Sequence, residues 1–219
     1  MSFSGVKALI FDADGTLVDS EVPGLDVLFD MAAPYWPGLT RPQAHDQFRG
    51  VRLAHCVAAI AQQAGCPGEA FEGPFLRDLR DAMASRFDQG LQPMPGAHDL
   101  LHALAIPFCV ATNGPRQKVE QTLAQSGLRH YFGEHVYCAY EVGSFKPEPG
   151  LFLHAAHALG VPPTDCAVVE DSLPGVQAAL AAGMRVFSLL PQHLAHGVPE
   201  AQVTFVESLQ KVGEHLNSF

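Results

Sequence analysis

The chain has 219 residues, of which 47% are hydrophobic, and a formal net charge of −10 at pH 7. This length and composition permit one buried core, or one core with a small satellite domain, and the negative charge disfavours nucleic acid and anionic membranes as partners. No apolar run approaches the roughly 20 residues of a membrane-spanning helix, and the first apolar run ends at acidic residues where a signal peptide would have a cleavage site, which favours a cytoplasmic location.

The chain begins with an apolar run at residues 6–11, which has the length of a buried strand. From about residue 22 to residue 89 the pattern is helical and no strand is evident. Gly and Pro cluster at both borders of this region, as in linkers that lead into and out of a small domain. We therefore expect an α-helical cap domain at residues 18–90, inserted into a core made of residues 1–17 and 91–219.

The remainder of the chain alternates between apolar runs and helical segments. Strands are expected at residues 107–112, 166–170, 184–190 and 203–206, and helices at residues 115–127, 149–160 and 174–183. Strands separated by helices form right-handed crossovers and a mostly parallel sheet that is covered on both faces. The predicted fold class is therefore α/β, with a Rossmann-like three-layer core and a small inserted helical cap.

Polar residues follow three of the predicted strands, and a lysine lies in a loop between two of them: Asp12 and Asp14, Thr112 and Asn113, Glu170 and Asp171, and Lys146. Because ligands of an open parallel sheet bind beyond the carboxyl ends of its strands, we expect these residues to meet there. So many carboxylates in one place favour a bound cation, and hard oxygen ligands are those that Mg²⁺ prefers. A cation and the Lys146 ammonium together suit a phosphoryl group.

Two aspartates also permit a division of labour. One carboxylate can attack phosphorus, and the other can protonate the leaving oxygen and later activate water. Each of these residues also has an ordinary structural interpretation: Asp12 and Asp14 as turn residues, Thr112 as a helix cap, and Lys146 as a surface side chain. Their occurrence together favours the catalytic interpretation.

Four segments carry a resemblance to a known family: "DADGT" at residues 12–16, "ATNG" at 111–114, "KPEP" at 146–149 and "VVEDSLPGVQAALAAGM" at 168–184. They resemble the four motifs of the haloacid dehalogenase superfamily, in the subfamily with an α-helical cap between the first and second motifs. The nearest likeness is to the β-phosphoglucomutase-like phosphatases. "FRGVRL" and "NGPRQK" resemble segments of small bacterial phosphatases that act on 6-phosphogluconate and similar sugar phosphates.

The resemblance implies a role for each matching residue. Asp12 would be the nucleophile and Asp14 the general acid and base. The Mg²⁺ ligands would be Asp12, the backbone carbonyl of Asp14, and Asp171, with Glu170 supporting the metal directly or through water. Phosphate would be bound by the residues of the second and third motifs: the side chains of Thr112 and Lys146, and the backbone N–H groups of Asn113 and Gly114.

Within the superfamily, Asp14 disfavours a dehalogenase, because the resemblance implies that dehalogenases lack this acid. The absence of any lysine from the expected cap disfavours a phosphonatase, which needs an amine as electron sink. Arg49 and Arg52 in the cap suit the far end of a phosphosugar, because a guanidinium binds carboxylate or phosphate. A distal phosphate would favour a mutase, and a distal carboxylate or hydroxyls would favour a phosphatase. We expect a phosphatase that acts as a monomer, with a dimer as the alternative; a β-phosphoglucomutase-like mutase and a catalytically silent binding protein remain alternative functions.

Overall fold

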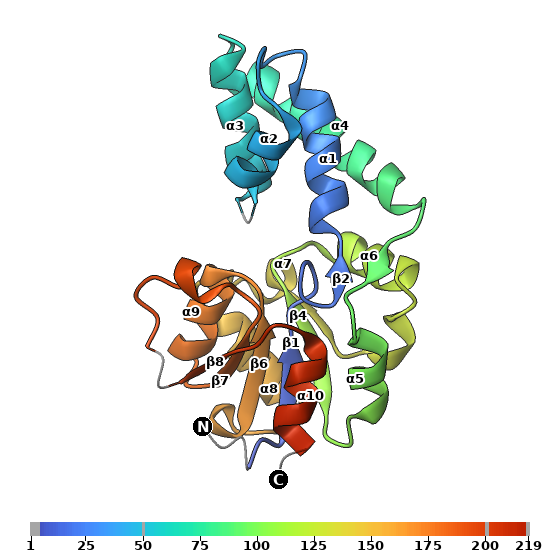
Figure 1. Cartoon of the computed structure of the whole chain (residues 1–219), viewed down its shortest axis with the longest axis vertical. Helices are drawn as coiled ribbons and strands as arrows, with labels where there is room; N and C mark the ends of the chain where they lie inside the picture. Colours follow the sequence, from blue (N-terminus) through green and yellow to red (C-terminus); the bar gives the residue numbers. More distant parts are fainter. Residues whose placement is uncertain (1–4, 50, 200–201, 218–219) are drawn as a thin grey trace. The chain divides into compact units, whose positions relative to one another are not determined.

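The computed structural model describes residues 5–49, 51–199 and 202–217. Contacts divide the chain into two compact units (Figure 1). Unit 1 comprises Met1–Asp19 and Gln92–Phe219, and unit 2 comprises Ser20–Leu91. No helix among the described residues combines the length and the hydropathy that crossing a membrane requires.

Unit 1 is built on a six-stranded sheet in which every neighbouring pair of strands is parallel. In spatial order its strands are β5 (Val136–Cys138), β4 (Phe108–Thr112), β1 (Ala8–Phe11), β6 (Cys166–Glu170), β7 (Arg185–Ser188) and β8 (Val203–Phe205). The five predicted strands are all present, and the expected Rossmann-like α/β core is confirmed. The additional strand, β5, is a short strand at the edge of the sheet.

The register of the central strands brings their carboxyl ends to one edge. Phe11, the last residue of β1, lies opposite Val110 of β4 and Val169 of β6. The Asp12 N–H donates to the carbonyl oxygen of Val169 at 3.0 Å, which continues the ladder for one more residue. The residues that follow or end these strands therefore face a common edge, where parallel sheets bind their ligands.

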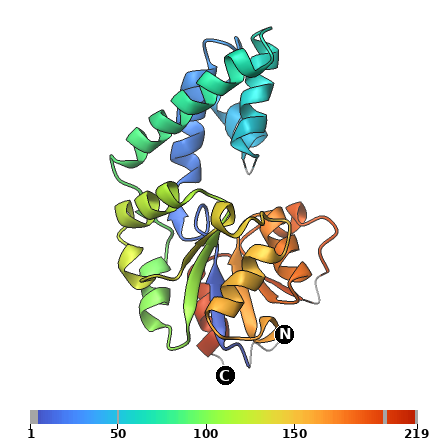
Figure 2. The same ribbon diagram turned by 180° about the vertical axis from the view of Figure 1, so that it is seen from behind.

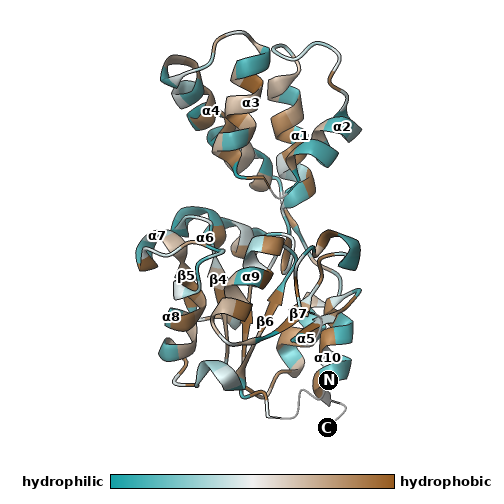
Figure 3. Ribbon diagram, turned by 90° about the vertical axis from the view of Figure 1, so that its left-hand side faces the viewer, coloured by the Kyte–Doolittle hydropathy of each residue, from teal (hydrophilic) through white to brown (hydrophobic). Residues whose placement is uncertain are grey.

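Helices cover both faces of this sheet, as the opposite views in Figures 1 and 2 show. The helices of unit 1 are α5 (Ala97–Ala103), α6 (Arg116–Gln125), α7 (Ala139–Val142), α8 (Gly150–Ala158), α9 (Leu173–Ala181) and α10 (Leu209–Asn217), with 3₁₀ turns at Arg129–Tyr131, Pro163–Asp165 and Gln192–Leu194. On one face, Ile10 and Val168 pack in a buried cluster with Phe152 of α8 and Val176 of α9. The strands between the helices are mostly brown in Figure 3, because both of their faces are buried.

Local sequence signals fix where α9 begins and ends. Ser172 is its N-cap, and the Ser172 hydroxyl accepts a hydrogen bond from the Gly175 N–H at 3.2 Å. Pro174 in the first turn needs no N–H partner there. Gly183 follows the helix with φ of 74°, a left-handed conformation that favours glycine. Helix α9 therefore begins at Leu173, two residues after Asp171, which is the last acidic residue of the fourth motif.

Two short strands mark the borders of unit 1. The strands β2 (Val18–Asp19) and β3 (Gln92–Pro93) pair in an antiparallel ladder, with Val18 opposite Pro93. The chain leaves unit 1 after β2 and returns to it at β3. Val18 and Asp19 therefore belong to unit 1, because their partners in the ladder do.

Unit 2 consists of four helices: α1 (Glu21–Ala32), α2 (Arg41–Phe48), α3 (Leu53–Gln63) and α4 (Glu69–Phe87). They enclose a small core of their own, which includes Leu28, Ile60 and Leu79. Trp36 packs edge-to-face on Phe48 at 6.1 Å between ring centroids. The described residues of unit 2 include no strand, in agreement with the helical insertion expected from the sequence.

Candidate active site

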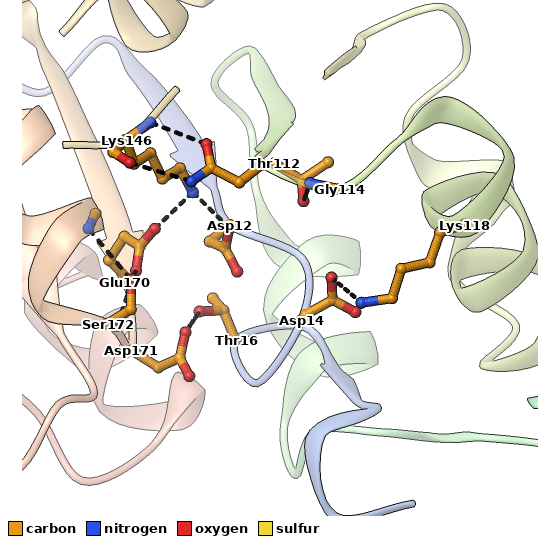
Figure 4. Close-up of polar contacts among 12 residues, drawn as sticks. Asp12, Asp14, Thr16, Thr112, Gly114, Lys118, Lys146, Glu170, Asp171 and Ser172 are labelled. Carbon is orange, nitrogen blue, oxygen red and sulfur yellow. Dashed lines mark hydrogen bonds and ion pairs between the residues drawn. The ribbon is translucent and has the colours of Figure 1, made fainter. Parts of the chain in front are cut away.

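A buried cluster of three charged side chains lies at the carboxyl edge of the sheet (Figure 4). Asp12 follows β1, Glu170 ends β6, and Lys146 comes from the loop between α7 and α8. Lys146 Nζ donates to Asp12 Oδ1 at 2.5 Å and to Glu170 Oε1 at 2.6 Å. Asp12 is 8% exposed, Lys146 3% and Glu170 0%, so this ammonium has almost no contact with solvent.

The charges of this cluster do not balance, because one ammonium lies between two carboxylates. Burial raises the pKa of Asp12 to about 7; the Lys146 charge opposes this rise, and the Glu170 and Asp14 charges add to it. Burial disfavours the ammonium of Lys146, but Asp12 and Glu170 together hold its pKa above the ordinary value. The Lys146 ammonium is therefore charged at neutral pH, and a further cation near Asp12 would favour the ionised carboxylate.

Both oxygens of the Glu170 carboxylate have hydrogen-bond donors within unit 1. Oε1 accepts from Lys146, and Oε2 accepts from the Ser172 N–H at 2.9 Å and the Ser172 hydroxyl at 2.8 Å. Gly175 lies so close that a Cβ atom there would be 1.9 Å from the carboxyl carbon. These contacts hold the Glu170 carboxylate against Lys146. Glu170 would therefore act on a bound metal through its effect on Lys146 and Asp12.

Asp171 lies against the turn that contains Asp14. The Thr16 hydroxyl donates to Asp171 Oδ1 at 2.9 Å, and Thr16 is fully buried. Gly15 has φ of 83°, and a Cβ atom at Gly15 would be 2.2 Å from Asp171 Oδ2. Only glycine suits both this backbone conformation and this close approach. The turn after β1 and the residue after β6 are thus in direct contact.

The side chain of Asp14 points away from Asp12 and toward α6 (Figure 4). Lys118 Nζ donates to Asp14 Oδ2 at 2.8 Å. Lys118 was not among the predicted site residues, although its sequence position carries a signal: a positive charge in the first turn of a helix is unfavourable with the helix dipole. A carboxylate partner compensates for that placement, so Lys118 joins the residues of the candidate site.

Thr112 is the last residue of β4, and Asn113 and Gly114 follow it. The Gly114 N–H donates to Thr112 Oγ1 at 3.0 Å, so the predicted phosphate donor has an internal partner here. The side-chain amide of Asn113 contacts the backbone of Lys146, a contact that the sequence did not predict. Thr112 is 2% exposed. The second and third motifs are therefore joined directly.

The oxygen donors near the turn after β1 suit a magnesium ion. Asp12 and Asp171 offer carboxylates, and the Asp14 backbone offers a carbonyl oxygen. Within the described residues, no group of three or more His, Cys, Asp or Glu side chains is arranged to hold a metal. Mg²⁺ commonly binds through one or two carboxylates, several waters and substrate phosphate, so it does not need such a group. The excess of carboxylates over ammonium groups also fits a cation here.

The two predicted cap arginines lie in unit 2. Arg49 Nη1 donates to Glu21 Oε2 at 2.6 Å, and the Arg49 side chain is 51% exposed. Arg52 is exposed at the N-terminus of α3. The ion pair of Arg49 with Glu21 is a surface pair, which contributes little to stability. Both guanidinium groups therefore retain donors for an anion, and their substrate roles stay predictions.

Comparison with known proteins adds to this geometry. Residues 6–183 match the model of the haloacid dehalogenase-like hydrolase family. The chain is 34% identical to the 6-phosphogluconate phosphatase of Escherichia coli strain K12 over 184 residues, which are 84% of this chain and 82% of the relative. It is 35% identical to the fructose-1-phosphate phosphatase of the same strain over 182 residues, with 80% and 92% covered.

A solved structure supports the fold. The crystal structure of a β-phosphoglucomutase homologue from Thermotoga maritima has a TM-score of 0.79 and 23% identity, and the match covers 97% of this chain and 99% of that one. At this identity the likeness concerns the fold alone. The sequence relatives agree with the subfamily indicated by the four motifs, and this structure agrees with the expected fold.

Proposed function

Because the chain belongs to the haloacid dehalogenase-like hydrolase family and has sugar phosphate phosphatases among its relatives, we propose that it is a Mg²⁺-dependent phosphatase of a small sugar phosphate or sugar acid phosphate, such as 6-phosphogluconate. The observation that carries this proposal is the buried contact of Lys146 with Asp12 and Glu170, at the edge where Asp14 and Thr112 also lie. In this proposal Asp12 is the nucleophile, Asp14 is the acid and Lys146 is the phosphate-binding ammonium.

In the first step of the proposed reaction, a carboxylate oxygen of Asp12 attacks phosphorus and forms a P–O bond. The ester P–O bond breaks, and its electron pair goes to the leaving oxygen, which takes a proton from Asp14. The Lys146 ammonium has three N–H groups, of which Asp12 and Glu170 receive two. The third N–H, together with the Thr112 hydroxyl, can donate to the phosphoryl oxygens.

In the second step, Asp14 takes a proton from water, and the water oxygen attacks the phosphoaspartate. The P–O bond to Asp12 breaks, its electron pair returns to the Asp12 carboxylate, and inorganic phosphate leaves. A bound Mg²⁺, held by Asp12, Asp171 and the Asp14 carbonyl, would offset the negative charge on the phosphoryl oxygens. In the structure Lys118 Nζ binds the Asp14 carboxylate, which points away from Asp12, so both proposed proton transfers require the Asp14 side chain to turn toward the leaving oxygen.

Release of inorganic phosphate tests this proposal. We expect phosphate release from a sugar phosphate or sugar acid phosphate, and a loss of at least ~100-fold when Mg²⁺ is removed with a chelator. The compounds to be tested are phosphosugars, phosphosugar acids, nucleotides and β-glucose 1-phosphate. The formation of glucose 6-phosphate from β-glucose 1-phosphate is measured in parallel. Isomerisation with little free phosphate would instead identify a mutase, and binding without turnover of any compound would identify a silent binding protein.

The proposal includes a substrate role for Arg49, which Arg52 shares. Replacement of Arg49 by Ala is expected to raise KM for the preferred substrate about tenfold, but to change KM for p-nitrophenyl phosphate less than twofold. The small aryl phosphate has no distal polar end for a guanidinium to bind. Arg77→Ala, in α4 of the same unit, is the control for loss of a positive charge. Equal effects of Arg49→Ala on both substrates would contradict the role.

A further inference from the structure

The side-chain amide of Asn113 makes two hydrogen bonds with the backbone of a single residue, Lys146. The Lys146 N–H donates to Asn113 Oδ1 at 2.9 Å, and Asn113 Nδ2 donates to the Lys146 carbonyl oxygen at 3.3 Å. The two residues are 33 positions apart in the sequence, so the amide joins two separate loops at the edge of the sheet. Asn113 is half-buried, which limits competition from water for these bonds.

These bonds fix Lys146 from its backbone, whereas Asp12 and Glu170 fix it from its ammonium. The next residue, Pro147, cannot provide an N–H donor to secure the loop from that side. The Asn113 amide thus supplies the described polar contacts of the Lys146 main chain with the second motif. Its loss would leave the position of the ammonium to the two carboxylates alone.

Asn113 also directly follows Thr112, whose hydroxyl is the other expected phosphate donor. Because Asn113 is covalently bound to Thr112 and hydrogen-bonded to the Lys146 backbone, its amide links the segments that carry the two expected phosphate donors. Displacement of a catalytic group by 1 Å can reduce the rate about 100-fold. A contact that fixes two phosphate donors at once is therefore of direct consequence for turnover.

On this geometry, and resting on the proposed phosphatase function, we propose that Asn113 is a positioning residue for phosphate binding and transfer. It acts through Lys146 and Thr112 by means of its side-chain amide. The residue type follows from the two bonds. A carboxamide has one acceptor and one donor on the same short side chain, whereas a carboxylate has no donor and glutamine is longer by a methylene group.

Two variants test this role. Asn113→Leu keeps the approximate shape of the side chain without its polar atoms. Asn113→Ala removes both the shape and the polar atoms. Both are expected to weaken competitive inhibition by inorganic phosphate by about tenfold and to lower kcat for p-nitrophenyl phosphate by about 10- to 100-fold. Thermal unfolding of each variant first establishes the fraction that is folded at the assay temperature, and the kinetic constants are calculated for that fraction.

Ser126→Ala is the matched control. Ser126 is the C-cap residue of α6, at the opposite end of that helix from the site, and its buried hydroxyl donates to the Thr122 carbonyl oxygen at 2.8 Å. Its loss is expected to lower Tm by a few degrees while kcat and phosphate inhibition stay within twofold of wild type. If the Asn113 variants behave as this control does, the positioning role is wrong. If the wild type neither releases nitrophenol nor is inhibited by phosphate, the proposed function fails instead.

Discussion

Asp12→Asn is expected to lower phosphate release by at least ~10³-fold, because the variant has no carboxylate to form the phosphoaspartate. The substitution changes almost no volume. Lys146 retains Glu170 as a charged partner, so the fold around the ammonium should persist. The loss of activity would therefore reflect the missing nucleophile.

The same variant is expected to be at least as stable as the wild type in metal-free buffer at pH 8. The pKa of Asp12 is raised from 3.8 to about 7, chiefly by burial, so the folded protein binds a proton on Asp12 that the unfolded chain has already released between these pH values. The contribution of Asp12 to stability is therefore largest below pH 4 and declines as the pH rises to about 7. Asparagine has no such decline.

Thermal unfolding with a chelator, measured from pH 5 to pH 8, compares the two proteins. The Tm of Asp12→Asn relative to wild type should rise as the pH rises. Asp165→Asn serves as the control for the same change of residue type, since Asp165 forms a surface ion pair with Lys7 at 2.9 Å. Phosphate release by Asp12→Asn near the wild-type rate would contradict the role of Asp12 as the nucleophile. A Tm of Asp12→Asn that falls relative to wild type as the pH rises would contradict the raised pKa of Asp12.

The backbone of this site follows from the sequence because parallel strands have only a few ways to pair. Asp12 and Glu170 each adjoin an apolar run of strand length, and the register places them on adjacent strands at the same edge. The turn after β1 is also predicted by the sequence, since Gly15 follows Asp14 where the chain reverses. By contrast, β5 has only three residues, too few for a pattern of hydrophobicity to be distinguished from a loop.

Side-chain directions could not be predicted in the same way. The contacts of the Glu170 carboxylate with Lys146 and Ser172 were not predicted, and its expected support of a metal, directly or through water, stays a prediction. Glu170 is fully buried, and its carboxylate would be an uncompensated buried charge without the Lys146 ammonium. The contact of Lys118 with Asp14 depends on the direction of α6, which a pattern of residues does not contain.

Gly175→Ala is expected to destabilise the protein by about 3 kcal/mol or more, because it combines steric overlap with disruption of a buried ion pair. The new Cβ atom would lie 1.9 Å from the carboxyl carbon and Oε1 of Glu170. Glu170 cannot move aside freely, since it is fully buried and bonded to Lys146 and Ser172. Phosphate release from the folded fraction should fall at least ~10-fold as Lys146 is displaced.

This substitution is informative because alanine would otherwise favour the helix. Gly175 lies in the first turn of α9 and is not among the glycines with positive φ, so replacement by alanine without steric overlap would stabilise the protein by roughly 0.5–1 kcal/mol.

Gly24→Ala in α1 is the matched control, since its Cβ would lie 3.7 Å from Met83, an ordinary contact. Urea unfolding of both variants separates the two effects. Gly24→Ala should unfold at the same or a higher urea concentration than wild type, and Gly175→Ala at a clearly lower one. If Gly175→Ala were as stable and active as Gly24→Ala, the carboxylate of Glu170 could not lie against α9, and the charge arrangement that holds Lys146 beside Asp12 would be wrong.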